Sequence, residues 1–218
     1  MNNKIYTIIV GILVGIIVNV YQFENPVMVI IILSIAGVMM MSIIPNFITI
    51  YFTKDMGRVS KYLEKSKNPI YNFYYAIAND NEIEVENALK KIDKKYKNTK
   101  WSSLFRVLHA HYKRDFAFIH NQLNNIKIKS FKAYYESLIE IENGNFKKAQ
   151  DMAINLSKPW MVKVVLSELS IKKGDIEEAK MHLDKAIEMT RGMQRYSLIS
   201  HKNRIGETMN EIANEKIH

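Results

Sequence analysis

Residues 144–149 read Gly-Asn-Phe-Lys-Lys-Ala, and residues 174–179, thirty positions later, read Gly-Asp-Ile-Glu-Glu-Ala. Each stretch is a turn-like pair followed by a segment with apolar residues at offsets 0, 3, 7 and 10, which is the period of one face of an α-helix. A third copy begins at residue 116, after Arg114-Asp115. The three sets are Phe116, Ile119, Leu123 and Ile126; Phe146, Ala149, Ala153 and Leu156; and Ile176, Ala179, Leu183 and Ala186.

The segments between these copies also have helical periodicity. Apolar residues recur at helical spacing over 101–112, 131–141 and 162–169, and a weaker first copy pairs 70–77 with 85–92. A helix hairpin alone cannot bury its apolar stripe, so neighbouring hairpins must pack together. We therefore predict three to four stacked hairpins and a capping helix around residues 193–215, with no strands.

The two quoted stretches resemble the turn that opens the second helix of a tetratricopeptide (TPR) repeat, and Leu156 and Ala186 fall where that family usually has a small residue. The resemblance covers roughly residues 70–190. The period here is 30 residues, not the family's 34, and the family's usual Trp, Leu, Gly and Tyr of the first helix are not matched in register. The resemblance implies a TPR-like α-solenoid with a concave surface that holds a peptide or partner protein. It does not imply catalysis.

The N-terminal quarter of the chain has a different composition. Residues 1–52 contain only Lys4 and Glu24 as charged groups, so the whole net charge of +9 lies in residues 53–218. Two uncharged runs, 5–21 and 26–52, are long enough to cross a bilayer, and we place the spans at about 5–21 and 26–48. A cleaved signal peptide is disfavoured, because a second span follows at once and no small-residue cleavage site is present.

The four residues between the runs, 22–25, force the two spans into an antiparallel hairpin with both chain ends on one side. This loop has no Lys or Arg, whereas Lys4 precedes the first span and a basic segment follows the second. The positive-inside rule then predicts a two-span protein of the cell membrane with cytoplasmic N- and C-termini. The expected fold is all-α: a transmembrane hairpin, 1–52, followed by a cytoplasmic repeat domain, 70–218.

Gly11 and Gly15 form a Gly-x-x-x-Gly pair in the first span, which permits close approach of another helix. One interpretation is a homodimer contact between the spans of two chains. The other, which we favour, is packing against the second span near Ser34 and Gly37.

Residues 53–69 predict an amphipathic basic helix and linker below the bilayer. Its basic stripe consists of Lys54, Arg58, Lys61 and Lys65, and its apolar stripe consists of Met56, Val59 and Leu63. The basic stripe suits the anionic headgroups of membrane lipids. The alternative, held equally, is a solvated face on a connecting helix whose apolar stripe packs on the domain.

Few residues suggest chemistry. The chain has no cysteine, which excludes disulfides and thiolate sites. His109 and His111 point away from each other on a helix, and Glu136 and Glu140 are more typical of a solvated acidic face than of an acid–base pair. No nucleotide-binding or hydrolase motif occurs. The sequence predicts no catalytic residue, cofactor or metal.

Basic residues suggest partners. The run Lys90, Lys91, Lys94, Lys95 and Lys97 lacks a recognition helix or stacking platform, so we do not expect nucleic acid as the ligand. Arg106, His109 and Lys113 lie opposite the apolar stripe that begins at Trp101, and are candidates for binding an acidic partner.

The leading hypothesis is a non-enzymatic, membrane-tethered adaptor or scaffold that binds a protein partner at the cytoplasmic face. The runner-up is an accessory subunit of a membrane export, envelope-assembly or stress-signalling complex, in which the spans contact the partner. A third class is an enzyme with an unrecognised site, which a deep pocket with convergent ionisable groups in the repeat groove would favour.

Overall fold

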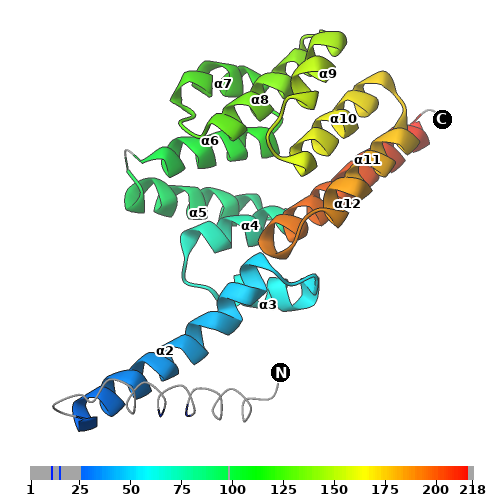
Figure 1. Ribbon diagram of the computed structural model, residues 1–218. Coiled ribbons are helices and arrows are strands. Elements are labelled where there is room, and N and C mark those ends of the chain that lie inside the picture. Colours follow the sequence, from blue (N-terminus) through cyan, green and yellow to red (C-terminus); the bar gives the residue numbers. More distant parts are fainter. Residues whose placement is uncertain (1–10, 12–14, 16–25, 98, 216–218) are drawn as a thin grey trace. The chain divides into compact units, whose positions relative to one another are not determined.

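The computed structural model describes residues 11, 15, 26–97 and 99–215, and the chain divides into two units, Met1–Phe52 and Thr53–His218. Every regular element in the described residues is a helix (Figure 1). The expected all-α class is confirmed.

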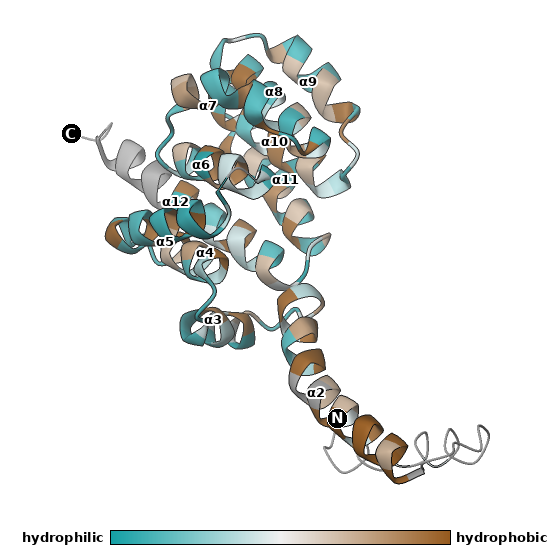
Figure 2. Cartoon of the chain, turned by 90° about the vertical axis from the view of Figure 1, so that its left-hand side faces the viewer, coloured by the Kyte–Doolittle hydropathy of each residue, from teal (hydrophilic) through white to brown (hydrophobic). Residues whose placement is uncertain are grey.

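In the first unit, helix α2 spans Pro26–Tyr51 and continues through Pro45 without a break. Near the C-terminal end of α2, Thr49 Oγ1 donates to the carbonyl of Pro45 at 2.8 Å. The 25 residues Val27–Tyr51 are long and apolar enough to cross a membrane, by length and composition alone, and the helix is strongly hydrophobic along its length (Figure 2). At ~1.5 Å per residue, such a helix exceeds the ~30 Å hydrocarbon core.

The first predicted span, 5–21, lies outside the described residues except for Gly11 and Gly15. Both are helical and exposed, and a Cβ built on either meets no described atom within 4 Å. The predicted close packing at this pair therefore stays a prediction.

The second unit consists of consecutive helices. Their bounds are α3 Met56–Lys65, α4 Pro69–Ala78, α5 Glu82–Lys95, α6 Lys100–Tyr112, α7 Phe116–Gln122, α8 Lys129–Glu142, α9 Phe146–Ile154, α10 Pro159–Lys173, α11 Ile176–Glu188 and α12 Gly192–Glu215, with a short 3₁₀ helix, Leu123–Asn125, after α7. Helices α4 and α5, α6 and α7, α8 and α9, and α10 and α11 pack as pairs, and each pair contacts the next.

The turns inside these pairs share one geometry. Each contains a residue with positive φ: Asp80 at 51°, Arg114 at 57°, Gly144 at 77° and Gly174 at 82°. The next residue then donates its amide back to a carbonyl of the first helix, which satisfies a carbonyl left free at the helix end. These bonds are Asn81 to Ala76 at 3.0 Å, Asp115 to Ala110 at 2.8 Å, Asn145 to Glu140 at 2.8 Å and Asp175 to Ser170 at 2.9 Å.

The residue after each turn also begins the second helix. The side chains of Asn81, Asp115 and Asp175 accept hydrogen bonds from amides of the first turn of α5, α7 and α11, as N-cap residues do. Asn145 differs, because its side-chain amide donates to Glu140 Oε2 at 2.7 Å instead. The sequence had indicated the later three turns. The structure adds Asp80-Asn81 as a fourth.

The repeated apolar positions of the second helices are buried or partly buried. Ile119, Ala149 and Ala179, which share one offset, are at most 2% exposed and belong to the second helix of their pairs. Trp101 is the exception on the predicted stripes, because it is 40% exposed at the start of α6.

Helix α3 belongs to the same compact unit as the helix pairs. Val59 and Leu63 are fully buried, and α3 contacts both α4 and α12. The backbone of Gly192 donates to the carbonyl of Thr53 at 2.8 Å. The stretch 53–69 is therefore integrated into the helical unit, and its apolar stripe is used for packing within the protein.

Helix α12 contacts α11 and also α3 and α4. It therefore connects the last helix pair to the first. Arg204 of α12 contributes to this connection by donating from Nη1 to the carbonyl of Ile77 at 2.9 Å.

Candidate functional site

A cavity of about 330 Å³ lies in the second unit where the turns of the helix pairs face α12. Its walls come from the first turn, the ends of α6, α8 and α10, and the middle of α12. The lining residues are Asp80, Glu82, His111, Tyr112, Lys113, Arg114, Phe116, Glu142, Glu168, Ile171, Lys172, His201, Arg204 and Ile205. This volume is at the lower end of the range for small-molecule sites.

A buried acid–base pair lies in the cavity wall. Glu168 Oε1 and His201 Nε2 are 2.8 Å apart, and the two side chains are only 16% and 18% exposed. Burial alone raises the pKa of the Glu168 carboxyl. The hydrogen bond and charge of His201, with smaller effects from His111 and Arg114, outweigh burial and lower the pKa to about 2. Glu168 is therefore a carboxylate at neutral pH.

His111 lies next to this pair. Its ring packs edge-on against Phe116 and Tyr135, with centroids 6.0 and 5.8 Å away, and lies 6.1 Å from the ring of His201. Burial lowers the pKa of His111 to about 4, against the smaller opposing effect of Glu168. His111 is therefore neutral at pH 7.

The charged groups at the rim are mostly paired. Lys113 Nζ lies 2.7 Å from Glu82 Oε1, and Lys172 Nζ lies 2.7 Å from Glu142 Oε2. These pairs join different helix pairs. The Glu82 and Lys113 pair links α5 to the turn after α6, and the Glu142 and Lys172 pair links α8 to α10.

Tyr112 connects the rim to the first turn. Its hydroxyl donates to Asp80 Oδ1 at 2.7 Å, and the Arg204 guanidinium lies 5.0 Å from the ring centroid. Burial, with the hydrogen bond to Asp80, raises the pKa of Tyr112 to about 12. Tyr112 is therefore a hydrogen-bond donor at all physiological pH values.

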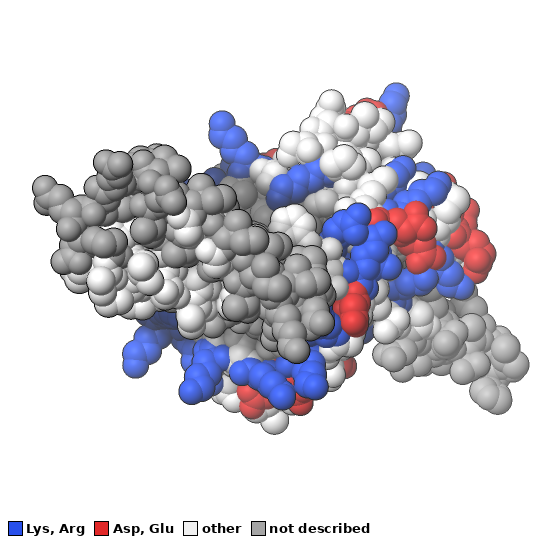
Figure 3. Space-filling model, turned by 60° about the horizontal axis from the view of Figure 1, so that its bottom comes forward, with Lys and Arg blue, Asp and Glu red and all other residues white. Residues whose placement is uncertain are grey.

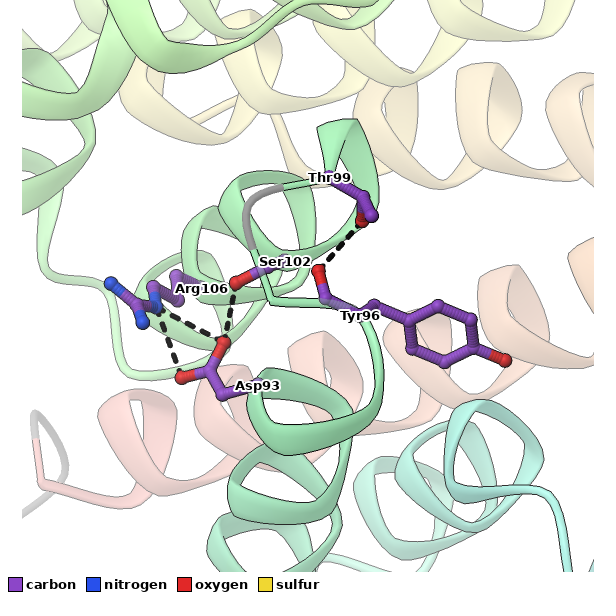
Figure 4. Close-up of polar contacts among 5 residues, drawn as sticks. All are labelled: Asp93, Tyr96, Thr99, Ser102 and Arg106. Atoms are coloured by element: carbon purple, nitrogen blue, oxygen red, sulfur yellow. Dashed lines mark hydrogen bonds and ion pairs between the residues drawn. The ribbon is translucent and has the colours of Figure 1, made fainter.

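The structure separates the three partner-binding candidates. Lys113 lines the cavity. Arg106 does not: its Nε donates to both oxygens of Asp93 on α5, at 3.1 and 3.0 Å, and Ser102 donates to the same carboxylate at 2.6 Å (Figure 4). His109 is partly buried outside the cavity, and its Nε2 has no hydrogen-bond partner among the described residues.

The predicted membrane-surface residues remain accessible. Lys54, Arg58, Lys61 and Lys65 are all exposed, whereas the apolar side of α3 is turned inward. Lys and Arg side chains stand around the edge of the face drawn in Figure 3, interspersed with acidic ones. The basic stripe is therefore available to a ligand that lies outside the helical unit.

The residues considered for chemistry are dispersed. Glu140 accepts from Lys148 at 2.7 Å, which with the hydrogen bond from Asn145 lowers its pKa, and Glu136 lies 4.0 Å from Lys132. No group of three or more His, Cys, Asp and Glu suited to a metal occurs in the described part of the chain.

A pocket with convergent ionisable groups, the feature that would favour an enzyme, is present in part. The cavity is present and ionisable groups converge on it, and the carboxylate of Glu168 orients the His201 ring as a proton-transfer imidazole requires. The described lining contains no Ser, Thr or Cys that this imidazole would activate as a nucleophile. The arrangement is suited to hydrogen bonding and charge recognition.

Sequence reasoning missed most of the lining. Glu168, His201 and Arg204 had no motif, because they meet only where α12 returns past the last helix pair to α4. One local signal was present. The turn residues at 144 and 174 are glycine, and the corresponding residue at 114 is arginine.

Comparisons with family models, with curated proteins and with solved structures find no match for this chain.

Proposed function

We propose that this protein is a membrane-tethered adaptor whose second unit is a TPR-like α-solenoid that binds a protein partner at the cytoplasmic face of the membrane. The observation that supports it best is the recurrence of one turn geometry at residues 80, 114, 144 and 174. The first interval is 34 residues and the next two are 30. Stacked hairpins of this kind bind partners on extended surfaces, and they do so without catalysis.

The tether consists of α2 together with the predicted first span, 5–21. The exposed apolar surface of α2 supports a place in the bilayer, since its Ile32 and Ile35 side chains are 58% and 56% exposed. With no Lys or Arg in residues 22–25 and five basic residues over 54–67, both termini lie in the cytoplasm.

The basic stripe Lys54, Arg58, Lys61 and Lys65 lies against the anionic headgroups of the inner leaflet. It follows α2 directly in the sequence and is exposed along α3. Each basic residue near an anionic surface contributes ~1 kcal/mol. The stripe thus supplements the anchor and orients the helical unit at the membrane.

The partner binds on the cavity face. This face has the rim ion pairs of Lys113 and Lys172, whose charges are accessible to an acidic partner segment. Opposed charges at such a rim steer association and select partners.

Site-specific photocrosslinking in native membranes tests this proposal. A photoreactive amino acid is placed in the full chain at Lys113 or Lys172. For comparison it is placed at Lys129, which is exposed at the N-terminal end of α8, whereas the cavity lies at the C-terminal end. We expect one defined protein to crosslink from both rim positions and not from Lys129. Absence of a crosslink at both rim positions, or equal capture at all three, would contradict the proposed surface.

The same experiment separates an adaptor from an accessory subunit. Residues 1–52 are exchanged for an unrelated hairpin of equal length. Retention of the rim crosslink supports a simple tether, whereas its loss supports specific contacts between the spans and the partner.

A further inference from the structure

The cavity turn has a backbone conformation that its residue does not favour. Arg114 has a φ of 57°, in the left-handed region, where two of the equivalent turns have Gly144 and Gly174 and the first has Asp80. A side chain in this region costs conformational energy that glycine does not incur. Arg114 therefore occupies a position where glycine is the easier residue, and its side chain lines the cavity.

The Arg114 guanidinium has no hydrogen bond or ion pair with the described residues, although it lies among acidic groups. Each of the four lining carboxylates already has a partner: Asp80 accepts from Tyr112, Glu82 pairs with Lys113, Glu142 pairs with Lys172, and Glu168 pairs with His201. Arg204 is also engaged, with the carbonyl of Ile77 and the Tyr112 ring. Arg114 is thus the cation of the described lining that has no protein partner.

His111 adds a second unused donor. It is partly buried and lines the cavity, and its ring makes no hydrogen bond with the described residues. A neutral imidazole has one N–H donor, and at the cavity wall the donor of His111 is left for a ligand. Arg114 and His111 lie near each other in the chain, and the backbone amide of Arg114 donates to the carbonyl of His111 at 3.1 Å.

We propose that this cavity binds a small molecule with an oxyanion group, a carboxylate or a phosphate, held by Arg114 and His111. The planar guanidinium presents paired N–H donors that match either group. Phe116, Ile171 and Ile205 supply apolar wall for the rest of the molecule. A volume of about 330 Å³ suits a ligand of metabolite size. This proposal does not rest on the proposed protein partner, which would contact the same cavity at its rim.

Binding in the cavity also affects the stability of the helical unit. The cavity is walled by the ends of α6, α8 and α10 on one side and by α12 on the other. A ligand that contacts Arg114 and His111 fills the space that separates these helices from α12. Bound ligand therefore stabilises the folded helical unit.

Thermal unfolding and calorimetry of the purified full-length chain in detergent test the proposal. The probes are inorganic phosphate, succinate and citrate, each compared with sodium chloride at equal ionic strength. We expect at least one probe to raise the melting temperature above the chloride value and to give saturable binding heat. A response to phosphate alone or to carboxylates alone distinguishes the two groups. Absence of a response to all three would overturn the proposal.

Variants then locate the site. Arg114→Gly is expected to fold with a melting temperature equal to or above that of the unmodified chain, and to bind the active probe at least tenfold more weakly. Arg114→Asn provides a second test, because asparagine also tolerates the left-handed conformation. His111→Phe keeps an aromatic ring in the packing and removes the N–H, and is also expected to weaken binding.

Lys129→Ala is the matched control, since it removes one exposed cation at the other end of α8. It is expected to leave both binding and melting temperature unchanged. Unchanged probe affinity in Arg114→Gly and Arg114→Asn, or an equal loss in Lys129→Ala, would show that general charge attraction and not this cavity binds the anion.

Discussion

Glu168 of α10 and His201 of α12 form a 2.8 Å hydrogen bond across 33 residues of sequence. Both side chains are mostly buried and line the cavity, so water has only limited access to the two groups. The bond holds the C-terminal helix against the last helix pair at the cavity wall. Because α12 also contacts α3 and α4, the pair contributes to the joining of the two ends of the helical unit.

We predict that His201→Phe lowers the free energy of unfolding by about 3 kcal/mol, because the Glu168 carboxylate remains buried without its partner. Urea denaturation of the full chain in detergent measures this loss. Glu168→Gln should cost less, about 1 kcal/mol, since its amide still hydrogen-bonds His201. The double variant Glu168→Leu, His201→Phe should recover part of the loss. A cost for His201→Phe no larger than that of Glu168→Gln would contradict a buried ion pair.

Acid should destabilise the helical unit through His111. The folded-state pKa of about 4 is below the ordinary 6.5, because burial disfavours the charged ring. Above pH 6.5 the ring is neutral in both states and there is no penalty. As pH falls from 6.5 to 4, the unfolded chain takes up a proton that the folded chain does not, and stability is lost, by about 3 kcal/mol in full. The charged groups that act on this ring are Glu168, His201, Arg204 and Arg114.

Urea midpoints at pH 7, 6, 5 and 4 measure this effect, with His111→Phe as the comparison. The variant should lose less stability than the unmodified chain between pH 6.5 and 4. Below pH 4.5 the stability of both proteins should decline further. The folded-state pKa of Glu168 is about 2, and its protonation removes the ion pair with His201. Parallel pH curves above pH 4.5 would exclude His111 as the source.

Gly174→Ala should lower the free energy of unfolding by about 1 kcal/mol, because φ is 82° at this position and alanine is strained there. A Cβ at Gly174 meets no atom within 4 Å, so the cost comes from the backbone alone. Gly57→Ala is the control. Gly57 lies within α3 and has no positive φ, so alanine there should be neutral or stabilising.

Arg106→Ala should cost less than about 1 kcal/mol, since Arg106 is 52% exposed and surface ion pairs contribute little. Its contact with Asp93 links α5 to α6 and lies outside the cavity (Figure 4). The rim crosslink from Lys113 should therefore persist in this variant. Loss of the crosslink with unchanged stability would show that Arg106 contributes to partner binding after all.

The protein should stay in the membrane fraction after washes with carbonate and high salt, because α2 is apolar over its length. The substitutions Ile32→Lys and Ile35→Arg each add ~2.5–3.5 kcal/mol to the free energy of inserting α2 into the bilayer. This double variant should move at least partly into the carbonate-soluble fraction. Ile32→Leu with Ile35→Leu is the conservative control and should behave as the unmodified chain. Release of the unmodified chain by salt alone would show that it is not integral.

The sequence by itself determined the helical class and the positions of the helix pairs. Apolar spacing, as in Phe146, Ala149 and Ala153, and turn residues such as Gly174 act over one or two helical turns, so their consequences are local. The apolar character of α2 is equally a property of its own residues. Whether it is the second span of a hairpin was not decided, because the first predicted span lies outside the described residues.

The tertiary structure decided the cavity and its chemistry. His111, Glu168 and His201 lie on three different helices, and a repeat pattern specifies only how each hairpin contacts its neighbours. Where α12 returns to α4 depends on how all the helices between them pack, which no short sequence pattern encodes. Packing also divided the α3 stripes, since Val59 and Leu63 were buried against the helical unit while Arg58 and Lys61 stayed exposed. Burial is a consequence of the whole fold, and so are the lowered pKa of His111 and the unpaired donors that define the site.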